Sequence, residues 1–364
     1  MNYPKLKTCN LQPQRIVVVR SLPGLGDLLC AVPAFRALRT AFPQAHITLI
    51  GLPLARDFVQ RFSHYLDEWL EFPGYPGIPE VTGSPQRLTS FLNDVQQSGF
   101  DLALQLHGSG IYTNPFTVLL GARVNAGFFI PGQYCPDSEY FFPYPDDQPE
   151  IRRNLQLLTS LGISLQGEEL EFPLWKSDWQ AFEAMRSSSP SGRIATTHDL
   201  QPGRYICIHP GASVSSRRWK PAQFAAVADA LAAQGFQIVL TGTAIEAQLT
   251  QAVADAMHSP AVDLAGKTSL GAIAALLKQA QLLICNDTGI SHLAAALQVK
   301  SVVLFSASDP NRWAPLNRHL HRIVTTPQCP TPDDSIPHPS SLIPHPSTLL
   351  SHANDLLQEL AYAP

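Results

Sequence analysis

The chain has 364 residues, of which 45% are hydrophobic and 15% are charged, and its formal net charge is −4. This length predicts two domains, the composition excludes a chain that is disordered throughout, and the net charge argues against a nucleic-acid partner. The N-terminus has no apolar signal-peptide region and no run is long enough to span a bilayer, so we expect a cytoplasmic protein. Loose attachment to a membrane surface is left open.

Short β-branched segments alternate with amphipathic segments in the first half of the chain. We expect strands at residues 15–20, 46–51 and 101–105, and helices at residues 27–41 and 86–97. This alternation predicts a parallel sheet with helices on both faces.

The same alternation begins again after residue 203. We expect strands at residues 204–209, 236–241, 262–264, 281–285 and 301–305, and helices at residues 221–234, 245–257, 270–279 and 288–297. The chain is therefore predicted to be an α/β protein with two separate sheet units.

Two segments with little periodicity divide the chain. The Ser-, Pro- and Gly-rich segment 187–203 predicts a linker between a first domain over 1–186 and a second over 204–326. A Pro-rich spacer over 327–347 and a terminal helical segment over 348–364 follow, and packing of that helix back on the first domain is left open. The spacer contains IPHPSS and IPHPST, whose histidines suggest a metal, but Pro-His-Pro without an adjoining acidic or cysteine ligand favours a solvated spacer.

The loop after the first strand carries a candidate base. Gly24 and Gly26 permit a tight turn, and Asp27 follows where a helix begins and offers unpaired N–H groups. Asp27 is either a helix cap or a general base. The loop resembles a dinucleotide fingerprint, but Leu29 replaces its third glycine and the second strand ends in Gly51 rather than an acidic residue. A nicotinamide cofactor is therefore not expected.

The loop after the first strand of the second unit, HPGASVSSRRWKP, concentrates positive charge in an acidic protein. Ser213 offers a hydroxyl, and Arg217, Arg218 and Lys220 stand just before the next helix. Guanidinium groups pair with phosphate oxygens through two hydrogen bonds. A solvated basic turn is the alternative, but the position between a strand and a helix favours a phosphate site.

Two more strand ends in the second unit carry polar residues. NDTGISHL places Asp287, Thr288 and Gly289 at a helix start, with His292 one turn later. His292 is either a packed helix residue or a ligand contact. Glu246, after TGTA, is either an ordinary first-turn glutamate or a hydrogen-bond partner of a ribose hydroxyl.

A phosphate site in one unit and a carboxylate in the other suit group transfer. Neither a Walker lysine motif nor a kinase glycine loop occurs, so phosphoryl transfer is disfavoured. His107, which ends a first-unit strand in LQLHGSG, either faces an acceptor or is structural.

The motifs GLGDLL, HPGASxxxRRWKP, GTAIE and NDTGISHLAAAL, in this order, resemble glycosyltransferase family 9, the ADP-heptose:lipopolysaccharide heptosyltransferases. The resemblance is dense over residues 204–315 and clear over residues 15–51. It implies a GT-B architecture, two Rossmann-like domains facing a central cleft, with the acceptor domain first and the nucleotide-sugar domain second. It also implies inverting transfer without a metal and without a cofactor other than the nucleotide-sugar donor.

The resemblance also implies roles for residues of this chain. Asp27 matches the proposed general base, and Glu246 matches the residue near the nucleoside. The segment matched to the donor's diphosphate and sugar comprises Asp287, Thr288, Gly289 and His292. Arg217 stands where heptosyltransferases commonly have lysine, which leaves the donor's identity open.

Taken together, these residues predict a transfer reaction with a single displacement. Asp27 would accept a proton from the acceptor hydroxyl, and Arg217 would stabilise the leaving diphosphate. Gly26 and His107 are expected on the acceptor side, and the acceptor is expected to be a glycan or glycolipid at the inner membrane face. A transferase for another nucleotide sugar, a nucleotide-binding protein without catalysis, and a Rossmann oxidoreductase are the alternatives.

Overall fold

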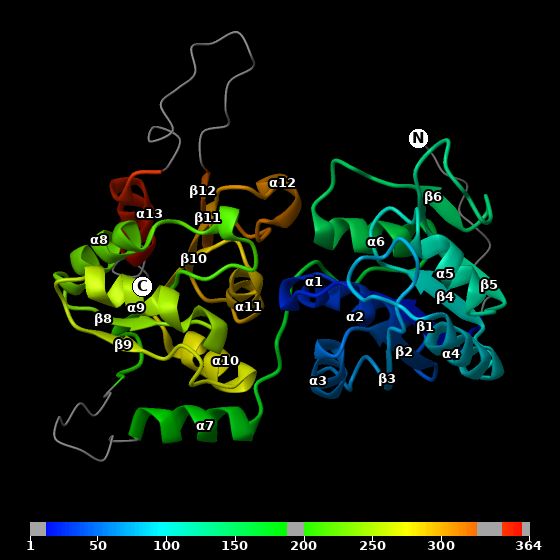
Figure 1. The fold of residues 1–364 in the computed structure, drawn as a ribbon, viewed down its shortest axis with the longest axis horizontal. Helices are drawn as coiled ribbons and strands as arrows, with labels where there is room; N and C mark the ends of the chain where they lie inside the picture. Colours follow the sequence, from blue (N-terminus) through cyan, green and yellow to red (C-terminus); the bar gives the residue numbers. More distant parts are fainter. Residues whose placement is uncertain (1–11, 188–199, 326–343, 359–364) are drawn as a thin grey trace, which may run out of the picture. The chain divides into compact units, whose positions relative to one another are not determined.

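The structure is a computed structural model that describes residues 12–187, 200–325 and 344–358. The chain divides into two compact units, Met1–Leu170 and Glu171–Pro364, and each contains a six-stranded parallel sheet (Figure 1). The prediction of two α/β units is confirmed. The expected linker and the Pro-rich spacer lie mostly outside the described residues.

The strands of the first unit are ordered β3-β2-β1-β4-β5-β6, all parallel. Its strands are β1 Arg15–Val19, β2 His46–Gly51, β3 Glu68–Glu71, β4 Leu102–Gln105, β5 Val124–Phe129 and β6 Phe141–Pro143. Its helices are α1 Leu25–Leu29, α2 Val32–Ala41, α3 Leu54–Arg61, α4 Pro85–Gln97, α5 Thr113–Leu119 and α6 Glu150–Ser160. From β1 the strands are added first toward β3 and then, from β4 on, toward β6, so the strand order reverses between β1 and β4. Doubly wound sheets bind ligands at such a reversal point, at the carboxyl ends of the strands.

Alternate residues of β1 pack on opposite faces of this sheet, as the period of a strand requires. Val17 and Val19 join a core with Val95 of α4 and Phe116 of α5. On the other face α2 packs against α6, and Phe35 of α2 lies edge-to-face with Phe58 of α3 at 6.3 Å between ring centroids. Both faces of the sheet are therefore covered by helices, so the polar candidate residues lie at the ends of the strands.

The second unit repeats this topology, with strands ordered β12-β11-β10-β7-β8-β9. Its strands are β7 Tyr205–His209, β8 Gln237–Leu240, β9 Ala261–Asp263, β10 Leu282–Asn286, β11 Ser301–Phe305 and β12 His321–Thr325. Its α-helices are α7 Lys176–Ser187, α8 Pro221–Ala232, α9 Ala247–Ala256, α10 Leu270–Gln279, α11 Gly289–Ala296, α12 Pro310–Trp313 and α13 Pro346–Gln358, with 3₁₀ turns η2 Ser215–Arg217 and η3 Ala244–Glu246. Its reversal point lies between β7 and β10.

The helix expected over residues 27–41 is two helices, α1 and α2. Pro33 has no N–H to donate, so one continuous helix would lack a hydrogen bond there, and Pro33 instead stands in the first turn of α2. The break at Cys30 and Ala31 keeps Asp27 in the short α1 immediately after β1.

The boundary between the units differs from the expected one at residue 186. The contacts divide the chain after Leu170, because α7 packs against α10 of the second unit. The segment that leads into the second sheet is thus longer than its Ser- and Pro-rich part alone.

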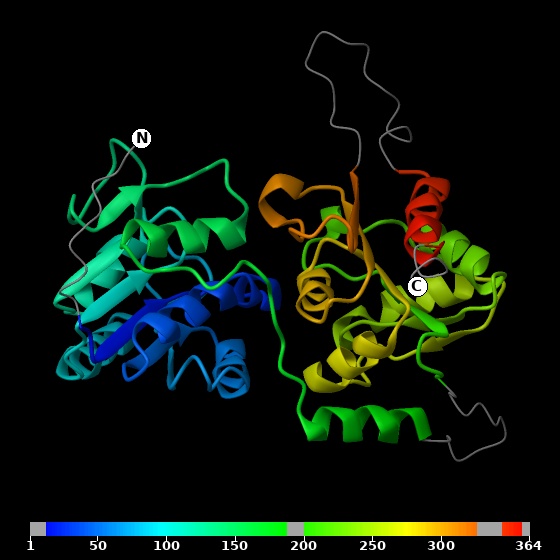
Figure 2. The ribbon, with the colours of Figure 1, turned by 180° about the vertical axis from the view of Figure 1, so that it is seen from behind.

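The terminal helix, for which the sequence leaves packing on the first domain open, packs instead in the core of the second unit. Leu349, Ala353 and Leu356 of α13 are buried in the core of the second unit with residues of α8. Helix α13 lies beside α8 (Figures 1 and 2). The Lys300 ammonium donates to the Leu356 carbonyl at the end of this helix. The helix therefore completes one face of the second sheet. Among the helices of the described segments, none has the length and apolar character needed to cross a membrane.

Acid is expected to destabilise the second unit through His321. Its Nδ1 lies 2.8 Å from Ser301 Oγ, and burial, with the nearby Arg318 and His292, lowers its pKa to about 4. The unfolded chain therefore takes up this proton first as the pH falls from about 7, and roughly 3 kcal/mol of stability is lost by about pH 4, below which both states are protonated.

The variant His321→Asn cannot titrate and retains a polar partner for Ser301, so we expect its melting temperature to depend less on pH between 7 and 4. His319→Asn, at an exposed position two residues away, is the control. Thermal unfolding at pH 7, 6, 5 and 4 measures the effect. Equal pH dependence in wild type and His321→Asn would contradict the prediction.

Candidate functional site

Asp27 is fixed by the backbone of its own loop. It is the third residue of α1, and its Oδ2 accepts from the Gly24 N–H at 3.0 Å. A Cβ at position 24 would lie 2.5 Å from that oxygen, so only glycine allows this close approach. Asp27 therefore caps the start of α1, which is one of the two roles that the sequence leaves open. The half-buried carboxylate is held at the carboxyl edge of the first sheet, beside the reversal point.

A buried arginine that the sequence analysis did not single out holds this loop in place. Arg20 is fully buried, and its guanidinium donates to the carbonyl oxygens of Asp27, at 2.7 Å, and Leu106. It also donates to Glu150 Oε1 at 3.2 Å and to Asn154 Oδ1 at 3.3 Å, both on α6. One side chain thus joins the loops after β1 and β4 to α6.

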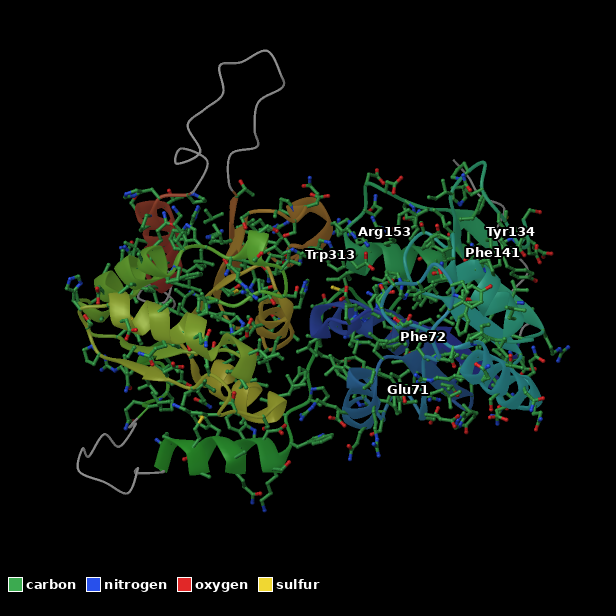
Figure 3. The ribbon with its side chains drawn as sticks, in the orientation of Figure 1. Glu71, Phe72, Tyr134, Phe141, Arg153 and Trp313 are labelled. Carbon is green, nitrogen blue, oxygen red and sulfur yellow. The ribbon has the colours of Figure 1, made fainter. Side chains whose placement is uncertain are left out.

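Glu150 also forms an ion pair with a second arginine. Arg153, labelled on α6 in Figure 3, donates from Nη1 to Glu150 Oε2 at 2.8 Å, and its guanidinium carbon lies 4.6 Å from the Tyr144 ring centroid. Side chains of Arg20, Glu150 and Arg153 are at most 4% exposed. Buried charges are tolerated only when they are paired and hydrogen-bonded, as they are here.

His107 lies in the loop after β4, beside the loop after β1. The Ser21 N–H donates to its Nδ1 at 3.2 Å, and Ser21 Oγ lies 3.0 Å from the same atom. Burial, reinforced by the charge of Arg20, lowers the pKa of His107 to about 4. At neutral pH the ring is therefore uncharged. Because Nδ1 accepts a hydrogen bond, the ring proton is on Nε2.

In the second unit, Asn286 fixes the basic loop after β7. Asn286 is fully buried at the end of β10, where its Oδ1 accepts from the Trp219 N–H at 3.2 Å. Its Nδ2 donates to the Pro210 carbonyl at 2.8 Å. Both ends of the loop are therefore tied to the strand across the reversal point, and Ser306 Oγ ties its middle by donating to the Ser216 carbonyl at 3.1 Å.

The three basic residues of this loop differ in their placement. Arg217 Nη1 lies 3.8 Å from Asp287 Oδ2, with the arginine side chain 33% exposed. The Arg218 Nε donates to the Ala212 carbonyl at 2.8 Å, so part of that guanidinium stabilises the loop itself. Lys220 and Ser213 are exposed. Arg217 is thus the cation that the structure places at Asp287.

The start of α11 lies at the same strand end. Asp287 is buried and accepts a short hydrogen bond from Ser308 Oγ, and Thr288 is the extended residue before the helix. From Gly289 onward the helix presents its first N–H groups, which attract anions. His292 is buried one turn later, with Trp313 (Figure 3) edge-to-face at 6.4 Å. A guanidinium and a helix N-terminus therefore meet here.

Glu246 lies in η3, just beyond the carboxyl end of β8, which pairs with β7. Its Oε2 accepts from the Thr243 N–H at 2.8 Å and from Thr243 Oγ1 at 2.9 Å. A Cβ at Gly211 would lie 2.0 Å from Glu246 Oε1, so the carboxylate rests directly on the Gly211 backbone. His209 Nε2 lies 3.9 Å from Oε2, and burial lowers the His209 pKa although the carboxylate opposes this shift. Glu246 is thus fixed within reach of the Gly211 loop.

Asn286→Ala is expected to loosen the basic loop. The buried Trp219 N–H and Pro210 carbonyl would both lose their partner, which costs roughly 1–3 kcal/mol of stability. An anion bound by the loop would bind more weakly, by roughly fivefold if binding loses the lower end of that cost, about 1 kcal/mol. Urea unfolding and calorimetric titration with nucleoside diphosphates measure the two effects. Asn354→Ala on α13, which removes the hydrogen bond from Gln234, is the control. An unchanged unfolding midpoint and unchanged affinity would contradict this account.

Comparison with known proteins decides the family. Residues 88–339 match the model of "Glycosyltransferase family 9 (heptosyltransferase)". Lipopolysaccharide heptosyltransferase 3 of Escherichia coli strain K12 is 33% identical over 306 residues, which cover 81% of this chain and 83% of that protein. The chain belongs to glycosyltransferase family 9. A family 9 enzyme transfers glycosyl groups, so the predicted enzyme class is confirmed.

Other family 9 proteins agree in sequence and fold. Lipopolysaccharide heptosyltransferase 2 of Salmonella typhimurium is 25% identical over 82% of this chain and 85% of its own length. The crystal structure of the family 9 glycosyltransferase from Veillonella parvula matches with a TM-score of 0.74 at 23% identity, over 95% of this chain and 98% of that one. E. coli ADP-heptose lps heptosyltransferase II matches with a TM-score of 0.70 at 20% identity, covering 95% and 99%. The family 9 GT-B fold is therefore shown.

The structure gathers the family 9 candidate residues into two sets. Asp27, Gly26 and His107 lie at the reversal point of the first sheet. The loop after β7, Glu246 and the start of α11 lie at the carboxyl ends of β7, β8 and β10 in the second sheet. Sequence reasoning missed Arg20, Glu150 and Asn286. Arg20 follows the apolar part of β1 and Asn286 ends the apolar strand β10, while Glu150 begins α6, a helix that was not predicted.

Proposed function

We propose that the chain transfers heptose from ADP-heptose to a hydroxyl group of a lipopolysaccharide-type acceptor, with inversion and without a metal. The observation that carries the donor side is the meeting of Arg217 and Asp287 with the start of α11, 3.8 Å separating the two side chains. A diphosphate suits a guanidinium and a helix N-terminus. Relatives named lipopolysaccharide heptosyltransferases support the sugar and the acceptor.

In the proposed reaction Asp27 takes the proton of the acceptor hydroxyl. The hydroxyl oxygen bonds to the anomeric carbon as the bond from that carbon to the diphosphate oxygen breaks, and the electron pair leaves with the diphosphate. One displacement inverts the anomeric centre. Arg217 and the N–H groups at the start of α11 stabilise the negative charge of the leaving group. Glu246, Thr288, Gly289 and His292 hold the donor, with Ser213, Arg218 and Lys220 in its surroundings.

Arg217 leaves the identity of the donor nucleotide open. Lysine is common at this position in heptosyltransferases, and arginine differs from it in shape and in hydrogen-bonding geometry. Transfer from another nucleotide sugar is therefore the second candidate function. No resident cofactor is proposed. We place the enzyme in the cytoplasm, with peripheral contact to the inner membrane face where a glycolipid acceptor resides.

A transfer assay tests the proposal. Purified protein is incubated with ADP-heptose, UDP-glucose or GDP-mannose, and with lipopolysaccharide truncated before its heptose residues, with and without EDTA. We expect transfer from ADP-heptose alone, undiminished by EDTA, and a product whose anomeric proton shows inversion by NMR. Transfer from another donor would move the function to the second candidate. Retained configuration or loss of activity in EDTA would contradict the mechanism.

A further inference from the structure

The loop between β3 and α4 contains a carboxylate, Glu80, one of whose oxygens has no hydrogen-bond partner among the described residues. Glu80 Oε2 is buried and has no hydrogen-bond partner among the described residues, and the Glu80 side chain is 14% exposed. A carboxylate turned toward solvent would be hydrated on both oxygens. A buried polar atom without a partner costs stability, and such atoms mark strain or function.

The fold holds Glu80 at the carboxyl edge of the first sheet. Two residues earlier, Ile78 is buried in the core of that sheet, and its N–H donates to the Tyr75 carbonyl at 3.0 Å. The Tyr75 ring packs on Phe116 of α5 at 5.5 Å between centroids. Glu80 therefore directly follows a packed part of its loop, which limits where its side chain can lie.

Glu80 faces the ring edge of His107. Its Oε1 lies 3.7 Å from His107 Nε2, too far for a direct hydrogen bond, and the two side chains are 14% and 11% exposed. Ser21 occupies Nδ1 of the ring, so Nε2 is left to donate toward Glu80. Because the pKa of His107 is lowered to about 4, the two groups do not form an ion pair at neutral pH.

We infer that Glu80 and His107 together bind a hydroxyl group of the glycan acceptor. The hydroxyl donates its proton to the Glu80 carboxylate and accepts from the Nε2–H of His107, a pairing that a sugar hydroxyl satisfies from both sides. This inference deepens the proposed function, on which it rests, by adding Glu80 as a determinant of acceptor binding. It gives His107 a defined partner.

Glu80→Gln and Glu80→Ala test the inference, with truncated lipopolysaccharide as the acceptor. We expect the acceptor KM to rise roughly ten- to hundredfold, since a hydrogen bond to a charged group is lost. The KM for the donor and the Kd for ADP should stay at wild-type values, and the melting temperature should not fall, because the unpaired oxygen makes no stabilising contact among the described residues. Glu71→Gln is the matched control, because the Glu71 carboxylate lies at the surface and pairs with Arg87 at 2.8 Å. Glu71 is labelled in Figure 3.

A double-mutant cycle with His107→Gln separates shared binding from two independent effects. If both residues bind one hydroxyl, the double variant loses acceptor affinity by less than the product of the two single losses. An acceptor KM within twofold of wild type in Glu80→Ala, or a fall in kcat with KM unchanged, overturns the inference.

Wild-type protein that binds no nucleotide and transfers no sugar would contradict the proposed function instead. Calorimetric titration with truncated lipopolysaccharide alone then still decides the inference. Weaker binding by Glu80→Ala than by wild type supports it, and equal binding or no binding by wild type overturns it.

Discussion

Asp27→Asn is expected to lower kcat by roughly two to four orders of magnitude, the usual contribution of a positioned general base. Asparagine keeps an oxygen that can accept from the Gly24 N–H, so the cap of α1 remains. Its amide does not take up a proton in the pH range of the assay. The change should therefore remove the base while leaving the loop in place.

Three comparisons make this result specific. The Kd for ADP should stay within about twofold and the stability within about 1 kcal/mol, the worth of a cap. Asp27→Ala should lose the cap as well and so be slightly less stable than Asp27→Asn. Asp57→Asn, at an exposed carboxylate in the first turn of α3, should leave turnover unchanged. Turnover by Asp27→Asn above a tenth of the wild-type value would assign Asp27 to capping alone.

Arg20→Met is expected to have the largest effect on stability, roughly 3–5 kcal/mol, because it breaks a buried ion pair and leaves Glu150 without its Arg20 partner. For a unit of this size the melting temperature should fall by roughly 10 °C. The carbonyl oxygens of Asp27 and Leu106 would lose their donor at the same time.

Arg123→Met is the matched control. The Arg123 side chain is 82% exposed, and its ion pair with Asp101 spans 3.4 Å. Exposed pairs of this kind contribute at most about 1 kcal/mol. Arg20→Lys keeps the charge but loses the branched geometry that reaches several acceptors, so an intermediate loss is expected. Differential scanning calorimetry compares the three variants. Equal effects of Arg20→Met and Arg123→Met would refute the stabilising role of the buried ion pair between Arg20 and Glu150.

The sequence predicted the strands that are rich in β-branched and aliphatic residues. The segments HITLIG and SVVLF appear as β2 and β11 at the expected bounds, because strands buried on both faces consist mostly of such residues. The helix LGAIAALLKQ likewise forms α10 over the expected residues, capped by Ser269 through the Ala272 N–H at 3.2 Å.

The elements that the sequence did not predict carry polar or small residues inside. The segment VNAGFF forms β5, although Asn125 and Gly127 weaken its strand pattern. The segment EIRRNLQLLTS forms α6, although Glu150 and Arg153 are buried charges on its inner side. Periodicity treats a buried charge as a surface residue, so only tertiary structure shows the pairing with Arg20 that makes these positions internal.

Some residues of the candidate site could likewise be predicted from the sequence, and others could not. Asp27, Glu246 and the NDTG segment stand out because carboxylates and glycines follow strands directly, and parallel sheets bring such strand ends to one edge. Glu80 and Asn286 do not stand out. Each depends on a contact between distant segments, Glu80 with His107 and Asn286 with Pro210 and Trp219.

Calorimetric titration of the purified protein with ADP, UDP and GDP tests most directly whether a nucleoside diphosphate is held at the start of α11. We predict selective binding of ADP that is lost in Asp287→Ala, since that variant removes the carboxylate that lies 3.8 Å from Arg217 and accepts from Ser308. Undiminished binding by Asp287→Ala, or no binding of any of the three nucleotides by folded wild-type protein, would contradict the assignment of the donor site.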